Sequence, residues 1–162
     1  MKKSIKKVLV LFLNIKICFI KLKAKIFGDY IINQYIEKCS ERNIRYSLEK
    51  FGADVANTSN VKRGLTLDNT YFRYDKLLIE ENCFIGRNVF LDLANKIFIK
   101  KDCVISEGVS ILTHQDVGNR ILSKYYKRKD GDVTFDEGCW IGANATILCG
   151  IVIGKCAVVA AG

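Results

Sequence analysis

The chain has 162 residues, enough for one domain with a sizeable core, and its apolar content of 49% argues against an intrinsically disordered protein. The seven cysteines form no CxxC pair and there is one histidine, which argues against the usual Cys/His zinc sites; the odd cysteine count favours reduced, cytosolic thiols. The formal net charge is +9, but eight lysines and no acid fall within residues 1–27, so the rest carries only +1 and nucleic acid is not an expected partner.

The first predicted element is a basic amphipathic helix over residues 1–27. Its longest uncharged run, VLVLFLNI at 8–15, is far short of the roughly 20 apolar residues that span a bilayer, and no signal-peptide cleavage site follows it. At about 100° per residue, one face carries Lys3, Lys7, Asn14, Lys21 and Lys25, and the opposite face carries Val8, Leu11, Phe12, Ile15, Phe19, Leu22 and Ile26.

That apolar face has two interpretations. It either attaches the chain to an anionic membrane surface or packs on the chain's own body or on a sister subunit. The expected location is therefore the cytoplasm, with peripheral contact at the cytoplasmic face of a membrane if the first interpretation holds. Residues 29–52 extend the helical region, and the Asn, Ser and Gly of 53–64 predict a turn-rich segment after it.

From residue 79 onward, large apolar residues recur every six positions. A helix would repeat every three or four residues and a two-sided strand every two, so a period of six predicts short strands and turns wound into a parallel β-helix. The rows are Ile79, Ile85 and Leu91; Ile99, Ile105 and Ile111; and Phe135, Ile141, Ile147, Ile153 and Val159.

Mostly small residues stand two positions before each of these apolar residues. Positions two apart share a face of a strand, so we expect both to point inward. They are Cys83, Val89, Cys103, Val109, Cys139, Ala145, Ile151 and Ala157. This interpretation makes the three cysteines small buried residues, with a catalytic cysteine as the rival.

The stretch DEGCWIGANATILCGIVIGKCAVVAAG at 136–162 is similar to the corresponding part of the hexapeptide-repeat acyltransferases, in particular the maltose, galactoside and polysaccharide O-acetyltransferases. The resemblance implies an all-β solenoid, a left-handed parallel β-helix, over residues 52–162, preceded by the helical segment 1–51. Relatives continue past VVAAG with another coil and a proline-bearing cap. A C-terminal coil and cap are therefore expected to be missing from this sequence.

The period of six stops at the single histidine. From Ile111 to Phe135 the intervening positions form no core row, so 114–132 is predicted to loop out of the solenoid. The resemblance implies that His114 is the general base, although a solvent-exposed loop histidine is the alternative; relatives often carry a second histidine two or three residues on, where this chain has Asp116 nearby. Asp92 is expected either to orient the base or to serve as a turn residue.

The resemblance also implies acetyl-CoA as co-substrate. No metal is expected, given the cysteine spacing and the single histidine. The positions that match the coenzyme groove are Trp140, Gly142, Ala143 and Ala161, for which ordinary turn geometry and packing are the alternatives.

The predicted function is CoA-dependent transfer of an acetyl group to a sugar hydroxyl in a surface polysaccharide or its precursor. The resemblance implies a homotrimer with the loop at subunit boundaries. A truncated, catalytically impaired scaffold or assembly protein is the alternative. A carbonic anhydrase would need a histidine cluster, and a nucleotidyltransferase would need a nucleotide-binding domain for which the residues before Ile79 show no glycine-rich loop.

Overall fold

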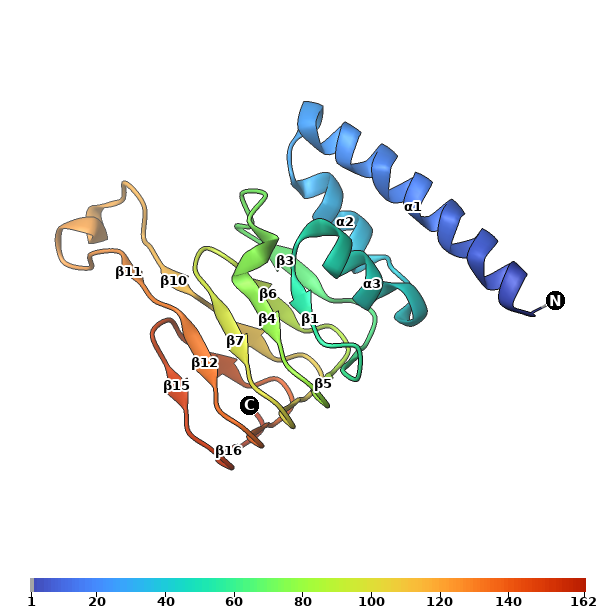
Figure 1. Cartoon of the computed structure of the whole chain (residues 1–162). Coiled ribbons are helices and arrows are strands. Elements are labelled where there is room, and N and C mark those ends of the chain that lie inside the picture. The colour runs from blue at the N-terminus through green and yellow to red at the C-terminus, as the bar shows by residue number, and fades with distance from the viewer. Residues whose placement is uncertain (1) are drawn as a thin grey trace.

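The computed structural model describes residues 2–162, with side chains from Lys7 onward, so the side chains of Lys2, Lys3 and Lys6 lie outside the description. Three helices precede a solenoid of short strands (Figure 1). They are α1 (Lys2–Phe27), α2 (Tyr30–Glu37) and α3 (Glu41–Phe51).

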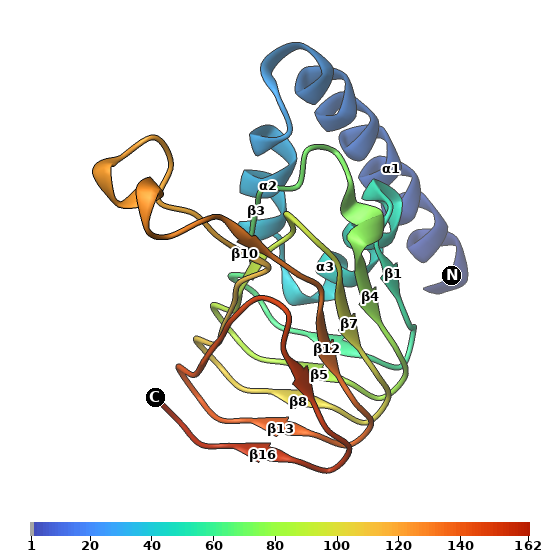
Figure 2. The same cartoon turned by 90° about the vertical axis from the view of Figure 1, so that its left-hand side faces the viewer.

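The strands form three parallel sheets that make the three sides of a prism (Figure 2). Sheet A contains β1 (Asp54–Val55), β4 (Leu77–Ile79), β7 (Ile97–Ile99), β12 (Val133–Phe135) and β15 (Val152–Ile153). Sheet B contains β2 (Asn60–Val61), β5 (Phe84–Ile85), β8 (Val104–Ile105), β13 (Trp140–Ile141) and β16 (Val158–Val159). Sheet C contains β3 (Thr66–Asp68), β6 (Phe90–Asp92), β9 (Ser110–Ile111) and β14 (Thr146–Ile147). The predicted parallel β-helix is confirmed.

The prism interior is built from the six-residue rows. Within sheet B, for example, Val61, Ile85, Ile105 and Ile141 are paired in register on successive coils and are all buried. The three cysteines expected inside are buried too, with Cys103 Sγ 3.4 Å from Cys139 Sγ. These thiols fill the narrow interior, where no substrate reaches them. Ile151, on the last coil of the solenoid, differs from the others in being 42% exposed.

Close approach between coils explains one of the corner glycines. A Cβ built on Gly86 would lie 2.5 Å from the backbone nitrogen of Glu107 on the next coil. Any side chain there would push two neighbouring coils apart. Other corners instead use residues in the left-handed backbone region, which Asn and Asp tolerate better than most side chains: Asn82, Asn88, Asp102 and Asn144.

Helices α2 and α3 cover the N-terminal end of the solenoid (Figure 1). Their buried Ile36 and Leu48 join the same apolar core as the coils, so the helices shield the first coil from water. Tyr74, in the short helix η1 (Tyr74–Lys76), is buried against them and donates a hydrogen bond from its hydroxyl to Asn33 Oδ1 at 2.8 Å.

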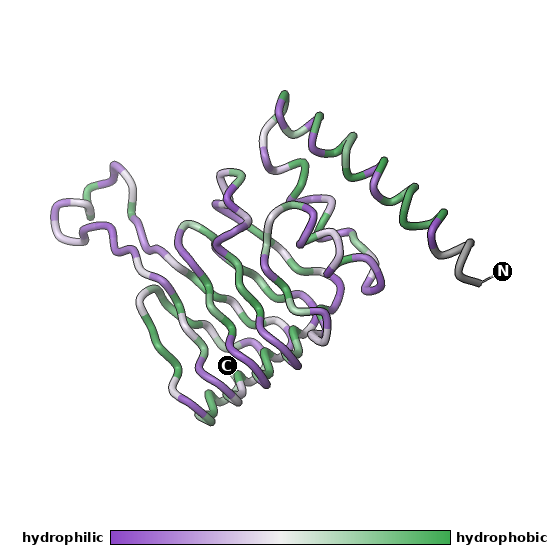
Figure 3. The backbone as a smooth tube through the Cα atoms, in the orientation of Figure 1, coloured by the Kyte–Doolittle hydropathy of each residue, from purple (hydrophilic) through white to green (hydrophobic). Residues whose placement is uncertain are grey.

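Helix α1 packs on this helical layer through a narrow stripe. Ile17 and Ala24 are buried, while Leu13 and Ile20 are half-buried. The Tyr46 hydroxyl donates to Asn14 Oδ1 at 2.6 Å and fixes the helix further. No helix in residues 2–162 is long and apolar enough to cross a membrane. Figure 3 shows that hydrophobic and hydrophilic residues alternate along α1, which lies outside the prism.

All variation in coil length falls at one edge of the prism, the corner between sheets C and A. Every A-to-B and B-to-C step joins register positions six residues apart. The C-to-A steps differ: Leu67 to Ile79 is 12 residues, Leu91 to Ile99 is 8, Ile111 to Phe135 is 24, and Ile147 to Ile153 is 6.

The longest of these corners is the 114–132 loop, which leaves the prism as predicted (Figures 1 and 2). It is more ordered than its composition suggests. Strands β10 (His114–Gln115) and β11 (Lys129–Asp130) form an antiparallel pair at its base, and the short helix η2 (Ile121–Lys124) lies at its tip. The first residue of this loop is the histidine.

Candidate functional site

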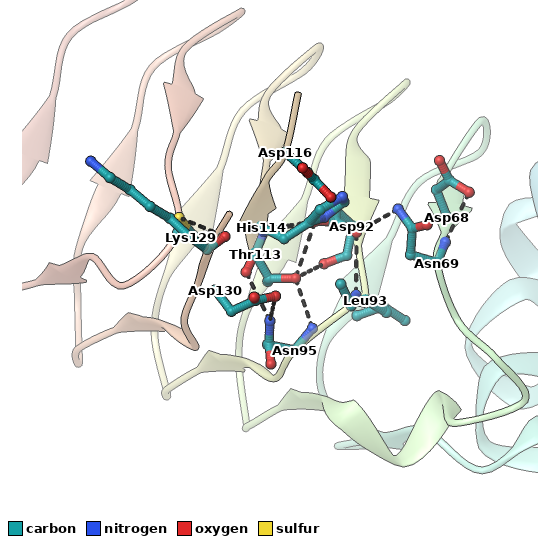
Figure 4. Close-up of polar contacts among 12 residues, drawn as sticks. Asp68, Asn69, Asp92, Leu93, Asn95, Thr113, His114, Asp116, Lys129 and Asp130 are labelled. Atoms are coloured by element: carbon teal, nitrogen blue, oxygen red, sulfur yellow. Dashed lines mark hydrogen bonds and ion pairs between the residues drawn. The ribbon is translucent and has the colours of Figure 1, made fainter. Parts of the chain in front are cut away.

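His114 lies where the chain leaves sheet C, just after β9. Its ring nitrogen Nδ1 is 2.6 Å from Asp92 Oδ2, and its side chain is 25% exposed (Figure 4). Asp92 ends β6, the strand paired with β9 on the preceding coil. Two neighbouring coils therefore present a carboxylate and an imidazole at the same edge, with the imidazole reaching solvent.

Asp92 is almost completely buried and its carboxylate is saturated with donors. Oδ2 accepts hydrogen bonds from the backbone N–H groups of Thr113 and His114 at 2.9 and 3.1 Å, besides its contact with the ring. Oδ1 accepts from Asn69 Nδ2 at 2.9 Å and from the Ala94 N–H at 3.2 Å. Asp92 is thus both a turn residue, through Ala94, and a partner of the imidazole.

These bonds decide the charge of the carboxyl group. Burial by itself raises the pKa of Asp92, but the hydrogen bonds from His114, Asn69 and the Thr113 and Ala94 backbones outweigh it and lower the pKa below its ordinary value. Asp92 is therefore ionised at neutral pH.

An ionised Asp92 also fixes the tautomer of the imidazole. A carboxylate can only accept, so Nδ1 of His114 must carry the hydrogen that it donates to Oδ2. In the neutral ring the lone pair then lies on Nε2, the nitrogen on the far side. This arrangement suits a general base: one nitrogen is held and the other is free to take a proton.

Asn69, Thr113 and Asn95 support the pair and were not predicted from the sequence. Asn69 comes from the coil before Asp92, at a left-handed backbone position with φ of 51°. The Thr113 hydroxyl donates to the Asp92 carbonyl oxygen at 2.8 Å and accepts from the Asn95 N–H at 2.8 Å. All of them stand at the C-to-A corner; for Asn95 and Thr113, the interrupted repeat at that corner is the signal that could have found them.

The base of the loop is tied to the same corner. Asn95 Nδ2 donates to the Thr113 carbonyl at 2.9 Å and to Asp130 Oδ1 at 3.2 Å, and Asp130 is the register partner of His114. Asp116, near the position where relatives often carry a second histidine, accepts from the Gly118 N–H at 2.8 Å and from Arg128 at 3.4 Å. Asp116 thus shapes the loop and does not contact the imidazole.

The four residues predicted to contact the coenzyme line one open groove of roughly 520 Å³. The Trp140 side chain is 53% exposed, and its Nε1 donates to Ser106 Oγ at 3.0 Å, so its ring lies on the outside of β13 and is not a core residue. The other residues of the groove are Phe84, Ser106, Glu107, Gly142, Ala143 and Val158 to Ala161.

Packing accounts for Gly142. A Cβ built there would lie 2.5 Å from the backbone nitrogen of Ala161 on the next coil.

The groove lies at the corner between sheets B and C, whereas His114 lies at the corner between sheets C and A. Within one chain, sheet C separates the two, so the structure does not bring the groove residues and His114 together.

Metal chemistry has no obvious place among the described residues. From residue 7 to the C-terminus, no group of three or more His, Cys, Asp or Glu side chains is arranged to hold an ion. Asp92, the carboxylate in contact with His114, is already engaged by five donors.

Comparison with known proteins gives the same fold. A family model described as the hexapeptide repeat of succinyl-transferase matches residues 76–113 and 134–162. No curated protein sequence matches the chain. A hexapeptide-repeat acetyltransferase from Vibrio cholerae superposes with a TM-score of 0.69 at 19% identity, covering 90% of this chain and 78% of that one; its acetyl-CoA complex superposes with a TM-score of 0.66.

Two further structures are similar. A maltose O-acetyltransferase from Clostridium difficile has a TM-score of 0.67 at 21% identity, with 81% of this chain and 70% of that chain covered. A galactoside acetyltransferase in complex with coenzyme A has a TM-score of 0.62 at 18% identity, with 90% and 70% covered. The resemblance predicted from residues 136–162 is confirmed. The chain therefore has the left-handed parallel β-helix fold that these acetyltransferases share, and its residues 76–113 and 134–162 match the hexapeptide repeat itself.

Proposed function

We propose that the chain is a CoA-dependent O-acetyltransferase that acetylates a sugar hydroxyl in a surface polysaccharide or its precursor. The observation that carries the proposal is the 2.6 Å contact between His114 Nδ1 and Asp92 Oδ2, which leaves Nε2 as the proton acceptor at the solvent side. A sugar hydroxyl is a weak nucleophile that needs such a base.

The reaction needs two proton transfers. As the hydroxyl oxygen attacks the thioester carbonyl carbon, His114 Nε2 takes the hydroxyl proton. When the tetrahedral intermediate collapses, the C–S bond breaks and the imidazolium returns a proton to the departing thiolate, which leaves as free coenzyme A. Asp92 keeps the ring oriented and stabilises the imidazolium between the two steps.

The groove beside Trp140 is the proposed site for acetyl-CoA. Its walls are largely apolar, and the small residues Gly142, Ala143 and Ala161 leave the backbone accessible, which suits a thin pantetheine arm. The acetyl-CoA complex of the Vibrio cholerae acetyltransferase and the coenzyme A complex of the galactoside acetyltransferase share this fold, which adds support.

A homotrimer is the proposed assembly. The groove and His114 lie at different corners of one prism, so a neighbouring copy could supply the groove that faces a given histidine. The loop tip also exposes large side chains suited to a subunit contact: Ile121, Leu122, Tyr125 and Tyr126.

The test is release of free coenzyme A thiol from acetyl-CoA with a panel of mono- and oligosaccharide acceptors. We expect acceptor-dependent release, and we expect His114→Ala to lower turnover by at least about 10²-fold, the lower range for loss of a general base. Circular dichroism of the variant should match that of the unchanged protein, because the His114 side chain is partly exposed and outside the core.

A matched control is Asp116→Asn, which alters a loop carboxylate that does not touch the imidazole. It should retain most of the turnover. Near-normal turnover of His114→Ala would show that another group is the base. Absence of thioester consumption with every acceptor would favour the alternative, a catalytically impaired scaffold.

A further inference from the structure

The face of α1 that points away from the protein is apolar along almost the whole helix. Phe12 is 65% exposed, Phe19 63% and Ile26 70%, although each is a large hydrophobic side chain. Isolated exposed apolar residues are ordinary, but a continuous stripe of this length is not. The stripe, here called the outer face, consists of Val8, Leu11, Phe12, Ile15, Phe19, Leu22 and Ile26.

A different stripe of α1 attaches the helix to the body. At about 100° per residue, Ile17, Ile20 and Ala24 point almost opposite to the outer face. Lys16 Nζ lies 5.1 Å from the Tyr35 ring centre and Lys21 Nζ lies 5.8 Å from that of Phe51, which adds contacts on the same side. The chain's own body is therefore already in contact with α1 and cannot cover the outer face.

Lysines flank the outer face on both sides. By the same helical rotation, Lys23 lies along one border of the stripe, and Lys7 and Lys25 lie beyond the other. No aspartate or glutamate occurs within residues 1–27 to neutralise them. Apolar side chains bordered by ammonium groups are complementary to a surface that is anionic outside and apolar just beneath.

We propose that α1 docks the protein on an anionic lipid bilayer, with its outer face in the interfacial region and its lysines among the headgroups. The helix lies along the surface without crossing it, because no helix in residues 2–162 can span a bilayer. At 26 residues, α1 is roughly 39 Å long and supplies a long line of contact. A second copy is a poorer occupant, since pairing two outer faces would bring two rows of lysines together.

The test is flotation or sedimentation with vesicles of phosphatidylglycerol and phosphatidylcholine, compared with phosphatidylcholine alone. We expect binding to the anionic vesicles at low salt, weakened by high salt because exposed charges are screened. The paired substitution Phe12→Ser, Phe19→Ser should weaken binding at least about 10-fold, since each phenylalanine contributes buried apolar area. The assay contains no acetyl-CoA, so its outcome is independent of the proposed enzymatic activity.

The matched control is Leu148→Ser with Val152→Ser, which removes two exposed apolar side chains near the C-terminal end of the solenoid, away from α1. It should bind vesicles as the unchanged protein does. Lys23→Gln with Lys25→Gln provides a second, charge-based variant and should weaken binding to anionic vesicles about 30-fold, at about 1 kcal/mol per lysine. Circular dichroism checks that all variants are folded.

Three outcomes would overturn the proposal. One is failure of the unchanged protein to bind anionic vesicles at low salt. Another is equal binding by the phenylalanine variant and by the Leu148→Ser, Val152→Ser control. The third is a smaller particle in light scattering for the phenylalanine variant alone, which would identify a second copy as the occupant of the outer face.

Discussion

Asp92 holds a full negative charge in a nearly inaccessible position because five hydrogen-bond donors surround it. Its folded-state pKa lies below the ordinary value of 3.8, so near that pH the unfolded chain binds more protons than the folded one. The stabilisation from Asp92 is therefore present above about pH 4 and is lost as the pH falls through the folded-state pKa.

Substitution Asp92→Asn should reveal this contribution. Replacing one acceptor oxygen by an NH₂ group sets donor against donor, so the free energy of unfolding should fall by about 1–3 kcal/mol near pH 5. The difference from the unchanged protein should shrink at a strongly acidic pH, once the pH has fallen through the folded-state pKa and the carboxyl group is protonated. Urea unfolding monitored by circular dichroism at both pH values measures it.

Asp68→Asn is the matched control, because Asp68 occupies the register position of Asp92 on the preceding coil but is exposed. Its effect should be small at both pH values. A difference for Asp92→Asn that stays constant between the two pH values would mean that its effect comes from packing and not from charge.

At the scale of the coils, close contact between corners sets what each position tolerates. Gly86→Ala places a Cβ 2.5 Å from a backbone nitrogen, and the backbone of a neighbouring coil cannot turn aside as a side chain could. We expect it to lower the free energy of unfolding by about 1–3 kcal/mol, the usual range for overpacking. Thermal denaturation should show a lower Tm.

Gly154→Ala is its matched control, since a Cβ there meets nothing within 4 Å and its φ is not positive. It should leave Tm nearly unchanged. Equal shifts for the two variants would indicate that loss of glycine flexibility, and not the contact between coils, determines the response.

The periodic elements could be predicted from the sequence because every coil repeats the same environment. Ile85, Ile105 and Ile141 are apolar because each points into the prism interior. The regular spacing of such residues makes the break after Ile111 easy to recognise in the sequence. The corner after Leu67 is different, because its six extra residues equal one repeat and leave the period unchanged. Asn69 was missed for that reason.

The helical segment shows another limit of the sequence. Its amphipathic character was predicted, yet the stripe that contacts the body is set by the shape of α2 and α3 and not by the most hydrophobic face. Ile17 and Ala24 are the buried residues, while Phe12 and Phe19 stay exposed. Hydropathy shows which face of a helix is most apolar, but shape complementarity decides which face packs on the rest of the protein.

For the whole molecule, we predict three copies in solution. Light scattering at micromolar concentration should give three times the 18.3 kDa mass of one chain. The paired substitution Tyr125→Ser, Tyr126→Ser at the exposed loop tip should shift the mass toward the monomer and lower turnover with it. A stable monomer with full acetyl transfer would contradict the trimer and place the complete site within one chain.

During evolution, the corner between sheets C and A can accept a kind of sequence change that the other two corners cannot. Residues can be added or removed there without shifting any inward row, because the next coil resumes in the same register. At the other two corners, a single added residue would turn the following core positions outward. The shape of the edge that carries His114 can therefore diverge by insertion and deletion, while the rest of the solenoid can change only by substitution.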